Sequence, residues 1–310
     1  MSIPIFQNGN CADDLAGTGS RACDIESFGD VTGFNLHPKN WSLAVSGNIT
    51  AEIWTNLIKG FNVRPFSDIY DFTQDTPDNE RSTSSRGIMN TIRLGKPQFS
   101  FMFTKGGCFH KALYAHRGSN RWDLSITFDT GILFAINEDN SKISGFDMGM
   151  FDVETFKLQQ GTDSQSSTAV MQLIDANQFN VKWVFLTWEQ LGVNLSRIEG
   201  VVNTSVIYSV EPTTSNTFRV KVGSACNTDD IILGLDSGDS WYLGGTQATA
   251  TTISSVAYQA DTKDYLFTLS SVLVSGDTVQ PTLISAGGYD VAADGAGGLY
   301  KGKAKLYTVS

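Results

Sequence analysis

Alternating apolar and polar residues run through most of this chain and predict β-strands. The clearest example is Trp122–Phe128, where Trp, Leu, Ile and Phe alternate with Asp, Ser and Thr, as in a strand with one buried face. Similar spacing predicts further strands at Phe34–Val45, Ile132–Ile136, Phe146–Phe156 and Ala169–Ile174. We therefore predict a mainly β protein.

Helical spacing is confined to short stretches. In Asn48–Gly60 the apolar residues recur at intervals of three and four, with Asn48 or Thr50 as the candidate N-cap and Gly60 near the end. Cys108–Arg117 predicts a second short helix, and Thr187–Gln190 fits a capping box that opens another before Gly192. The class is thus all-β with one or two short helices.

A long polar run, Asp71–Gly87, interrupts the strand pattern and contains one large apolar side chain, Phe72. The flanking segments Val63–Phe72 and Ile88–Phe103 both alternate as half-buried antiparallel strands do. We therefore predict a long hairpin arm that leaves a β core and returns to it. Because long loops in compact domains are usually functional or disordered, we expect this arm to contact other subunits.

The contact residues expected on the arm are polar or charged, apart from one proline. We expect its framing strands to pair within one subunit and its tip, near Thr76–Ser84, to be ordered by a neighbouring subunit. The predicted contact residues are Asp71, Thr73, Asp75, Thr76, Pro77, Asp78, Glu80, Arg81, Ser84 and Arg86.

The spacing of strand-like runs and turn residues changes near Val201. Seven short strand-like runs follow, separated by Gly, Asp, Ser and Asn, among them Ile231–Leu235 and Lys303–Val309. Their count and spacing are typical of an immunoglobulin-like β-sandwich, although the Cys-Trp-Cys framework of antibody domains is missing. We predict an extended segment over residues 1–33, a β core with the arm over 34–200 and a sandwich over 201–310.

The chain has a net charge of -10, with 32 acidic and 22 basic side chains. Such a field repels a phosphate backbone, so we expect no specific nucleic-acid binding, although an acidic surface suits DNA that must slide past without sticking. The sequence has no apolar run of the ~20 residues that a transmembrane helix needs and no signal-peptide pattern at its start. We therefore expect a soluble, unsecreted protein without a membrane partner.

The sequence carries no recognisable catalytic motif, so we expect a protein that is not an enzyme. Nucleophile-elbow, Walker, zinc-protease and Rossmann motifs are absent from the sequence. Cys108 and His110 are better explained as a buried thiol and a partly solvated imidazole, since Cys-His dyads normally join distant segments. Three acidic clusters, at Asp75–Glu80, Asn137–Lys142 and Asp236–Asp239, could suggest calcium binding, but none has the full ligand pattern of a calcium-binding loop. They are better explained as solvated turns, which Asp, Asn and Ser stabilise through their side chains. We expect no cofactor and no metal.

The remaining cysteines leave two possibilities open. The four cysteines include no CxxC motif, which argues against a zinc site. Cys11 and Cys23 could form a disulfide across a Gly-rich segment in an oxidising environment, but assembly in a cytosol would keep both thiols reduced.

Taken together, the β core with one principal helix, the arm, the acidic balance and the appended sandwich resemble the tail tube (major tail) proteins of tailed bacteriophages. The residues that carry this resemblance are Asp71–Gly87, Arg93–Phe103, Trp122–Ile126 and the module from about Val201. The resemblance is one of architecture and covers most of the chain. It implies a tail-tube-like β-sandwich or barrel core in a non-enzymatic virion protein assembled in the host cytoplasm.

The resemblance also implies partners. It implies self-assembly into stacked rings, commonly hexameric, around a channel for DNA, with the arm lapping onto the adjacent ring and contacts to other virion proteins. Residues 1–33 depart from short tube proteins, which leaves a ring, baseplate or head component as an alternative. Many antiparallel strands without an active site would also suit a jelly-roll major capsid protein or a non-catalytic adhesive or carbohydrate-binding β protein.

Overall fold

The computed structural model describes residues 28–44, 49–162, 164–285, 288–294 and 296–310, and the chain divides into two compact units. The first unit ends at Ile198 and the second begins at Glu199, next to the change of spacing at Val201. Strands make up 46% and helices 12% of the residues that the structure describes, so the mainly β class predicted from the sequence is confirmed. Cys11 and Cys23, for which the sequence left a disulfide and two reduced thiols open, lie outside the described residues.

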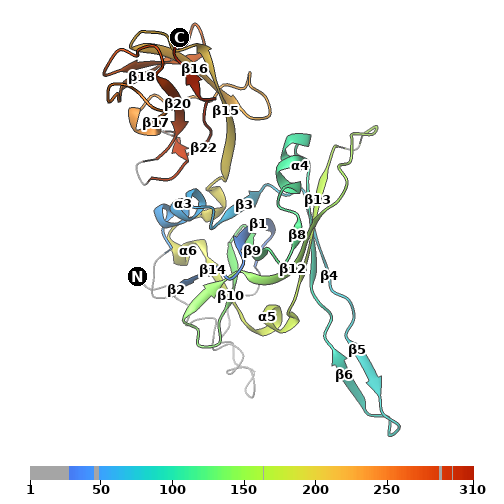
Figure 1. The fold of residues 1–310 in the computed structure, drawn as a ribbon. Coiled ribbons are helices and arrows are strands. Elements are labelled where there is room, and N and C mark those ends of the chain that lie inside the picture. Colours follow the sequence, from blue (N-terminus) through green and yellow to red (C-terminus); the bar gives the residue numbers. More distant parts are fainter. Residues whose placement is uncertain (1–27, 45–48, 163, 286–287, 295) are drawn as a thin grey trace. The chain divides into compact units, whose positions relative to one another are not determined.

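The first unit contains fourteen of the described strands (Figure 1). They are β1 (Val31–Pro38), β2 (Ser42–Ala44), β3 (Arg64–Ser67), β4 (Asp71–Asp75), β5 (Glu80–Thr83), β6 (Met89–Arg93), β7 (Gln98–Phe103), β8 (Gly118–Ser119), β9 (Trp122–Phe128), β10 (Gly131–Ile136), β11 (Lys142–Ser144), β12 (Phe146–Val153), β13 (Ser167–Leu173) and β14 (Trp183–Thr187). Strand β1 begins at Val31, three residues before the predicted start of the β core at residue 34.

Twelve of these strands form one hydrogen-bonded network that divides at β9. One edge of β9 pairs antiparallel with β1 along its length. The other edge is shared, because Leu133 of β10 lies opposite Ile126 whereas Phe146 of β12 lies opposite Leu124. The network therefore separates into a first sheet around β1, β10 and β14 and a second sheet of β12, β13, β7 and β4.

Phenylalanines fill the space between these two sheets. Phe34 on β1 lies 4.7 Å from Phe101 and 6.0 Å from Phe103, both on β7, measured between ring centroids. All three rings are at most 1% exposed, and burying each contributes about 1.5–3 kcal/mol. The alternation of β7 and β13 between buried and half-buried residues follows from this packing, as the sequence predicted.

The opposite face of the first sheet is covered as well, which the sequence did not predict. Trp54 of helix α3 (Ala51–Lys59) packs edge-on against His37 and Phe134, and all three side chains are fully buried. Every residue of β9 is also buried, including Asp123, Ser125 and Thr127, which the alternation had assigned to solvent.

The described residues contain four α-helices, more than the one or two expected. The helix predicted within Asn48–Gly60 is confirmed as α3, where the Thr50 hydroxyl accepts the Ile53 N–H at 3.2 Å. The capping box at Thr187 is also confirmed. The other helices are α4 (Gly107–Tyr114), α5 (Ala176–Val181) and α6 (Trp188–Leu191), with a 3-10 turn at Leu195–Arg197.

The second unit is a sandwich of two sheets. Its elements are β15 (Val201–Val210), β16 (Thr217–Ser224), a 3-10 turn at Gly238–Ser240, β17 (Trp241–Gly244), β18 (Ile253–Gln259), β19 (Asp264–Leu269), β20 (Thr278–Leu283), β21 (Ala292–Ala293), β22 (Leu299–Lys301) and β23 (Tyr307–Thr308). One sheet has the order β18-β19-β16-β15-β22-β21 and the other β17-β20-β23.

This strand order matches that of immunoglobulin constant-type domains. If β15–β20 and β23 are lettered A to G in chain order, the sheets contain the orders D-E-B-A and C-F-G of those domains, and β22 and β21 extend the first sheet beyond A. Trp241 begins strand C, is 4% exposed and packs edge-on against Phe267 at 4.9 Å, while Phe267 stacks on Phe218. These aromatic rings fill the core between the two sheets.

Two predicted strands of this unit are wrong in extent. Ile231–Leu235 forms only an isolated bridge between Ile231 and Gly223, because the segment crosses the sandwich as a loop that buries Leu235. Of Lys303–Val309, only Tyr307–Thr308 is a strand, and Lys303 makes a single bridge to Thr282.

Candidate functional site

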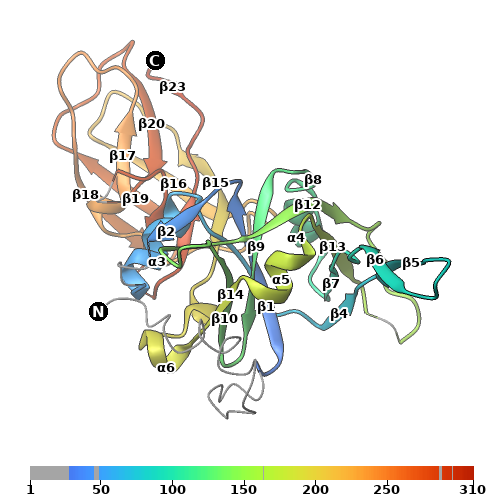
Figure 2. The same cartoon turned by 90° about the horizontal axis from the view of Figure 1, so that it is seen from below.

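The arm is the most exposed structured part of the first unit. Its root is the antiparallel pair β4 and β7, in which Phe72 lies opposite Phe101. Beyond the root the hairpin β5–β6 continues away from both sheets, as Figures 1 and 2 show from two directions. Every residue of β5 and β6 is exposed. The hairpin therefore has no covering layer within its own chain in the described structure.

The hairpin ends in a turn that its sequence specifies. The Ser84 carbonyl accepts the Gly87 N–H at 2.9 Å, and Ser84 in turn donates its N–H to the Ile88 carbonyl at 2.8 Å. Gly87 has a φ of 75°, the left-handed conformation that a three-residue hairpin loop needs at this position. The tip thus lies at Ser84–Gly87, not within Thr76–Ser84 as predicted.

The predicted contact residues are spread along one limb of the arm, and all of them are exposed. Those at the root, Asp71 to Asp75, also hold the arm to β7. The others follow in the link between the two ladders, in β5 and in the turn: Thr76, Pro77, Asp78, Glu80, Arg81, Ser84 and Arg86.

Sequence reasoning missed the apolar side chains of the returning limb. Ile88, Met89 and Ile92 are 58%, 61% and 63% exposed. They had been placed in the half-buried strand Ile88–Phe103, but that segment divides into the exposed β6 and the partly buried β7. Since β6 pairs only with β5, no second layer lies over these side chains in the described residues.

The arm narrows at a link between its two ladders. Gly95 donates its N–H to the Asn79 side chain at 2.8 Å, and a Cβ added at Gly95 would lie 1.6 Å from the Pro77 carbonyl oxygen. Only glycine allows this close approach of the two limbs. An open cavity of about 400 Å³ lies at this level and is lined by both limbs and by Gln172 of β13.

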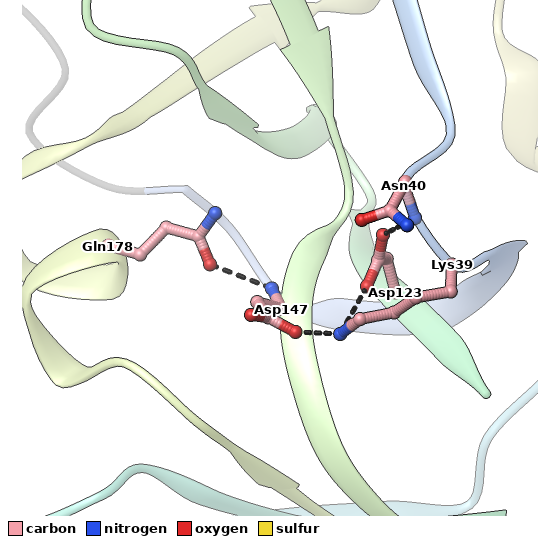
Figure 3. Close-up of polar contacts among 5 residues, drawn as sticks. All are labelled: Lys39, Asn40, Asp123, Asp147 and Gln178. Atoms are coloured by element: carbon pink, nitrogen blue, oxygen red, sulfur yellow. Dashed lines mark hydrogen bonds and ion pairs between the residues drawn. The ribbon is translucent and has the colours of Figure 1, made fainter. Parts of the chain in front are cut away.

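A second polar cluster lies where the two sheets divide (Figure 3). Lys39 extends between Asp123 of β9 and Asp147 of β12, forming an ion pair with each, 3.2 Å to Asp123. The Asn40 N–H donates to Asp123 at 2.9 Å, and the Asp147 N–H donates to the Gln178 side chain at 2.7 Å. Burial raises the pKa of Asp123 despite the nearby Lys39 ammonium.

The arrangement around Lys39 suits a structural role. Both carboxylates already share the ammonium group, which ties the end of β1 to the two strands that separate at the division. The open cavity of about 310 Å³ beside them is lined by these groups together with Asn137 and Lys142. The cluster offers paired charges and no activated nucleophile.

His37 and Ser125 also form a pair that resembles catalytic geometry. The His37 Nε2 lies 2.9 Å from the Ser125 hydroxyl, which also accepts a hydrogen bond from Asn35 at 3.1 Å. His37 and Ser125 are 0% exposed, so no substrate can reach them without unfolding. Burial lowers the pKa of His37 to about 3, which fits a neutral structural imidazole.

The predicted Cys108 thiol is corrected by the structure. Cys108 is disulfide-bonded and only half-buried near the start of α4, where the sequence had suggested a buried free thiol. His110 on the same helix hydrogen-bonds to the Ser167 hydroxyl at 3.1 Å. The described Cys226 is likewise disulfide-bonded.

The acidic turn at Asn137–Lys142 behaves as the turn interpretation predicted. Asp139 accepts hydrogen bonds from the Ser141 hydroxyl and N–H, and these lower the pKa of Asp139. Within the described ranges, no group of three or more His, Cys, Asp and Glu side chains is placed to hold a metal ion. None of the described helices is long and apolar enough to span a bilayer.

Comparisons with known proteins add no relative to this picture. No protein-family model matches the chain, and no curated protein matches its sequence. The functional argument therefore depends on the residues and their geometry.

Proposed function

We propose that this protein is a structural subunit that assembles with copies of itself, and that the arm connects one copy to the next. The observation that supports this most strongly is the exposed hairpin β5–β6 with its apolar residues Ile88, Met89 and Ile92. A two-stranded hairpin is only marginally stable in water when nothing packs against it. A neighbouring subunit would supply the missing layer.

The apolar side chains give this contact a favourable free energy. Ile88, next to the turn, and Ile92, in β6, are two of the exposed apolar side chains of the returning limb. Transfer of their exposed surface into an interface would contribute about 1 to 2 kcal/mol per side chain. In a ring every subunit repeats the contact, so this modest free energy adds up around the assembly.

The assembly that these features fit best is a phage tail tube of stacked, commonly hexameric rings within a virion. A two-sheet core with a projecting arm and an appended immunoglobulin-like unit support this form. The net charge of -10 suits a channel through which DNA moves without sticking. Other virion proteins would then contact the ends of the tube.

The test is a pair of matched double variants. Ile88→Ser with Ile92→Ser removes two of the exposed apolar side chains of the arm, while Leu158→Ser with Val181→Ser removes side chains of similar exposure, 72% and 68%, outside it. Electron microscopy and sedimentation velocity would follow assembly. We expect the arm variant to lose ordered multimers and the control to keep them. Equal assembly of both variants would argue against the arm as the connector.

The form of the particles distinguishes a tail tube from the competing functions. Stacked rings with a central channel support a tail tube, whereas closed shells support a capsid protein and single rings a baseplate or ring component. A wild-type protein that stays monomeric at high concentration and binds immobilised glycans would instead favour an adhesive or carbohydrate-binding protein.

A further inference from the structure

Two arginines of the first unit rest on the same tryptophan. The guanidinium of Arg64 on β3 lies 4.6 Å from the Trp122 ring centroid, and that of Arg121 lies 5.4 Å from it. Trp122 is 6% exposed and is held in place by a 2.7 Å hydrogen bond from its indole N–H to the His116 carbonyl. The indole therefore fixes both positive charges at one place on the surface.

Neither arginine has a carboxylate partner among the described residues. Each ion pair of the described residues joins other side chains, such as Arg117 with Asp152 at 2.6 Å. The Nε of Arg64 is buried and makes no hydrogen bond in the described structure. Burial and the neighbouring Arg121 both lower the pKa of Arg64, so this half-buried charge lacks the compensation that such charges usually have.

The imidazole of His116 lies beside the two arginines and strengthens the case that they bind an anion. His116 lies 3.4 Å from the Arg64 guanidinium. Burial and the two arginines lower the pKa of His116 to about 4, so the imidazole is neutral at pH 7. The chain has ten more acidic than basic residues. Two arginines without a carboxylate partner, next to a neutral histidine, therefore form a site that suits a carboxylate.

The outgoing limb of the arm carries carboxylates that also lack partners. Asp75, Asp78 and Glu80 are exposed, and none of them forms an ion pair in the described residues. They lie within six residues of one another along an extended segment. The two guanidinium groups and this acidic segment carry opposite charges. Guanidinium and carboxylate groups are both planar and can form paired hydrogen bonds with each other.

We propose that Arg64 and Arg121, held on Trp122, bind the acidic limb Asp75–Glu80 of a second copy of this chain. The inference depends on the proposed self-assembly and names the surface that receives the arm. The apolar limb would supply most of the contact free energy, while the arginine pair fixes where the arm docks and in which direction it runs.

Charge reversal with rescue tests this docking site. Arg121→Glu reverses one half of the pair without disturbing the core, because the side chain is exposed. Lys111→Glu is the matched control, an exposed cation on neighbouring α4. Sedimentation velocity over a concentration series gives the association constant, and circular dichroism verifies the fold. We expect Arg121→Glu to weaken association about tenfold or more and Lys111→Glu to leave it unchanged.

The rescue variant combines Arg121→Glu with Asp78→Arg and Glu80→Arg. We expect the combination to recover part of the association, since the charge at position 121 and two charges of the arm are then exchanged. If Arg121→Glu assembles as the wild type does while the Ile88→Ser, Ile92→Ser variant fails, the arm docks elsewhere and this inference is wrong although the proposed function stands. If the wild type never associates, both are wrong.

Discussion

The buried imidazole of His37 makes the first unit less stable in acid. Its Nδ1–H donates to the Asn62 carbonyl at 3.3 Å, so Nε2 must accept from the Ser125 hydroxyl at 2.9 Å. The ring also stacks on Trp41 with centroids 4.2 Å apart. Protonation would add a charge in a site that is 0% exposed and would break the Ser125 hydrogen bond.

The magnitude follows from the two pKa values. Burial lowers the pKa of His37 from 6.5 to about 3 in the folded protein, whereas the unfolded chain keeps the higher value. Between these values only the unfolded state binds the proton, so the free energy of unfolding falls as the pH falls. At about pH 4.5 the loss from this one group is about 2.7 kcal/mol, at about 1.36 kcal/mol per pH unit.

The assay is urea unfolding monitored by tryptophan fluorescence between neutral pH and about pH 4.5, comparing the wild type with His37→Gln. The first unit holds five of the six tryptophans, so its transition dominates the signal. We expect the variant to be less stable at neutral pH but to lose much less stability on acidification. Carboxylates contribute equally to both proteins and cancel in the difference. Parallel pH profiles for the two proteins would refute the reasoning.

Three further predictions concern local features. Thr50→Ala should lower the free energy of unfolding by about 1 kcal/mol through loss of the α3 N-cap, with Thr50→Ser as the neutral control in the same urea assay. Gly95→Ala should separate the limbs of the arm and weaken assembly in sedimentation while leaving the thermal midpoint of the core unchanged. Burial raises the pKa of Asp123, so the folded state favours the protonated form of this side chain. The contribution of Asp123 to stability therefore falls as the pH rises through the folded pKa, and Asp123→Asn should remove that fall.

Local patterns predicted the elements of the fold well where sequence and packing agree. The β9 segment Trp122–Phe128 and helix α3 with its Thr50 cap are confirmed because alternation, helical spacing and capping are local properties. Alternation cannot tell whether the polar face of a strand meets water. Ser125 was therefore assigned to solvent, although Trp54 of α3 belongs to the layer that covers this face.

The candidate sites were harder to predict because their members are distant in sequence. Lys39 and Asp147 are 108 residues apart, and only the division of the sheets at β9 brings them together. In the arm, the same apolar spacing continues from Ile92 to Phe99, but Pro97 and Gly95 separate an exposed strand from a core strand. The sequence predicted the arm itself, yet it could not show that the arm's apolar residues point to solvent.

The measurement that tests the central proposal most directly is hydrogen exchange of the backbone amides of β5 and β6, before and after assembly of the full chain. If the arm docks on a neighbouring copy, amides from Arg81 to Ile92 should exchange at least about tenfold more slowly in the assembled particles, because docking adds stability to a hairpin that is marginal alone. Particles in which these amides exchange as fast as in the monomer would contradict the proposal.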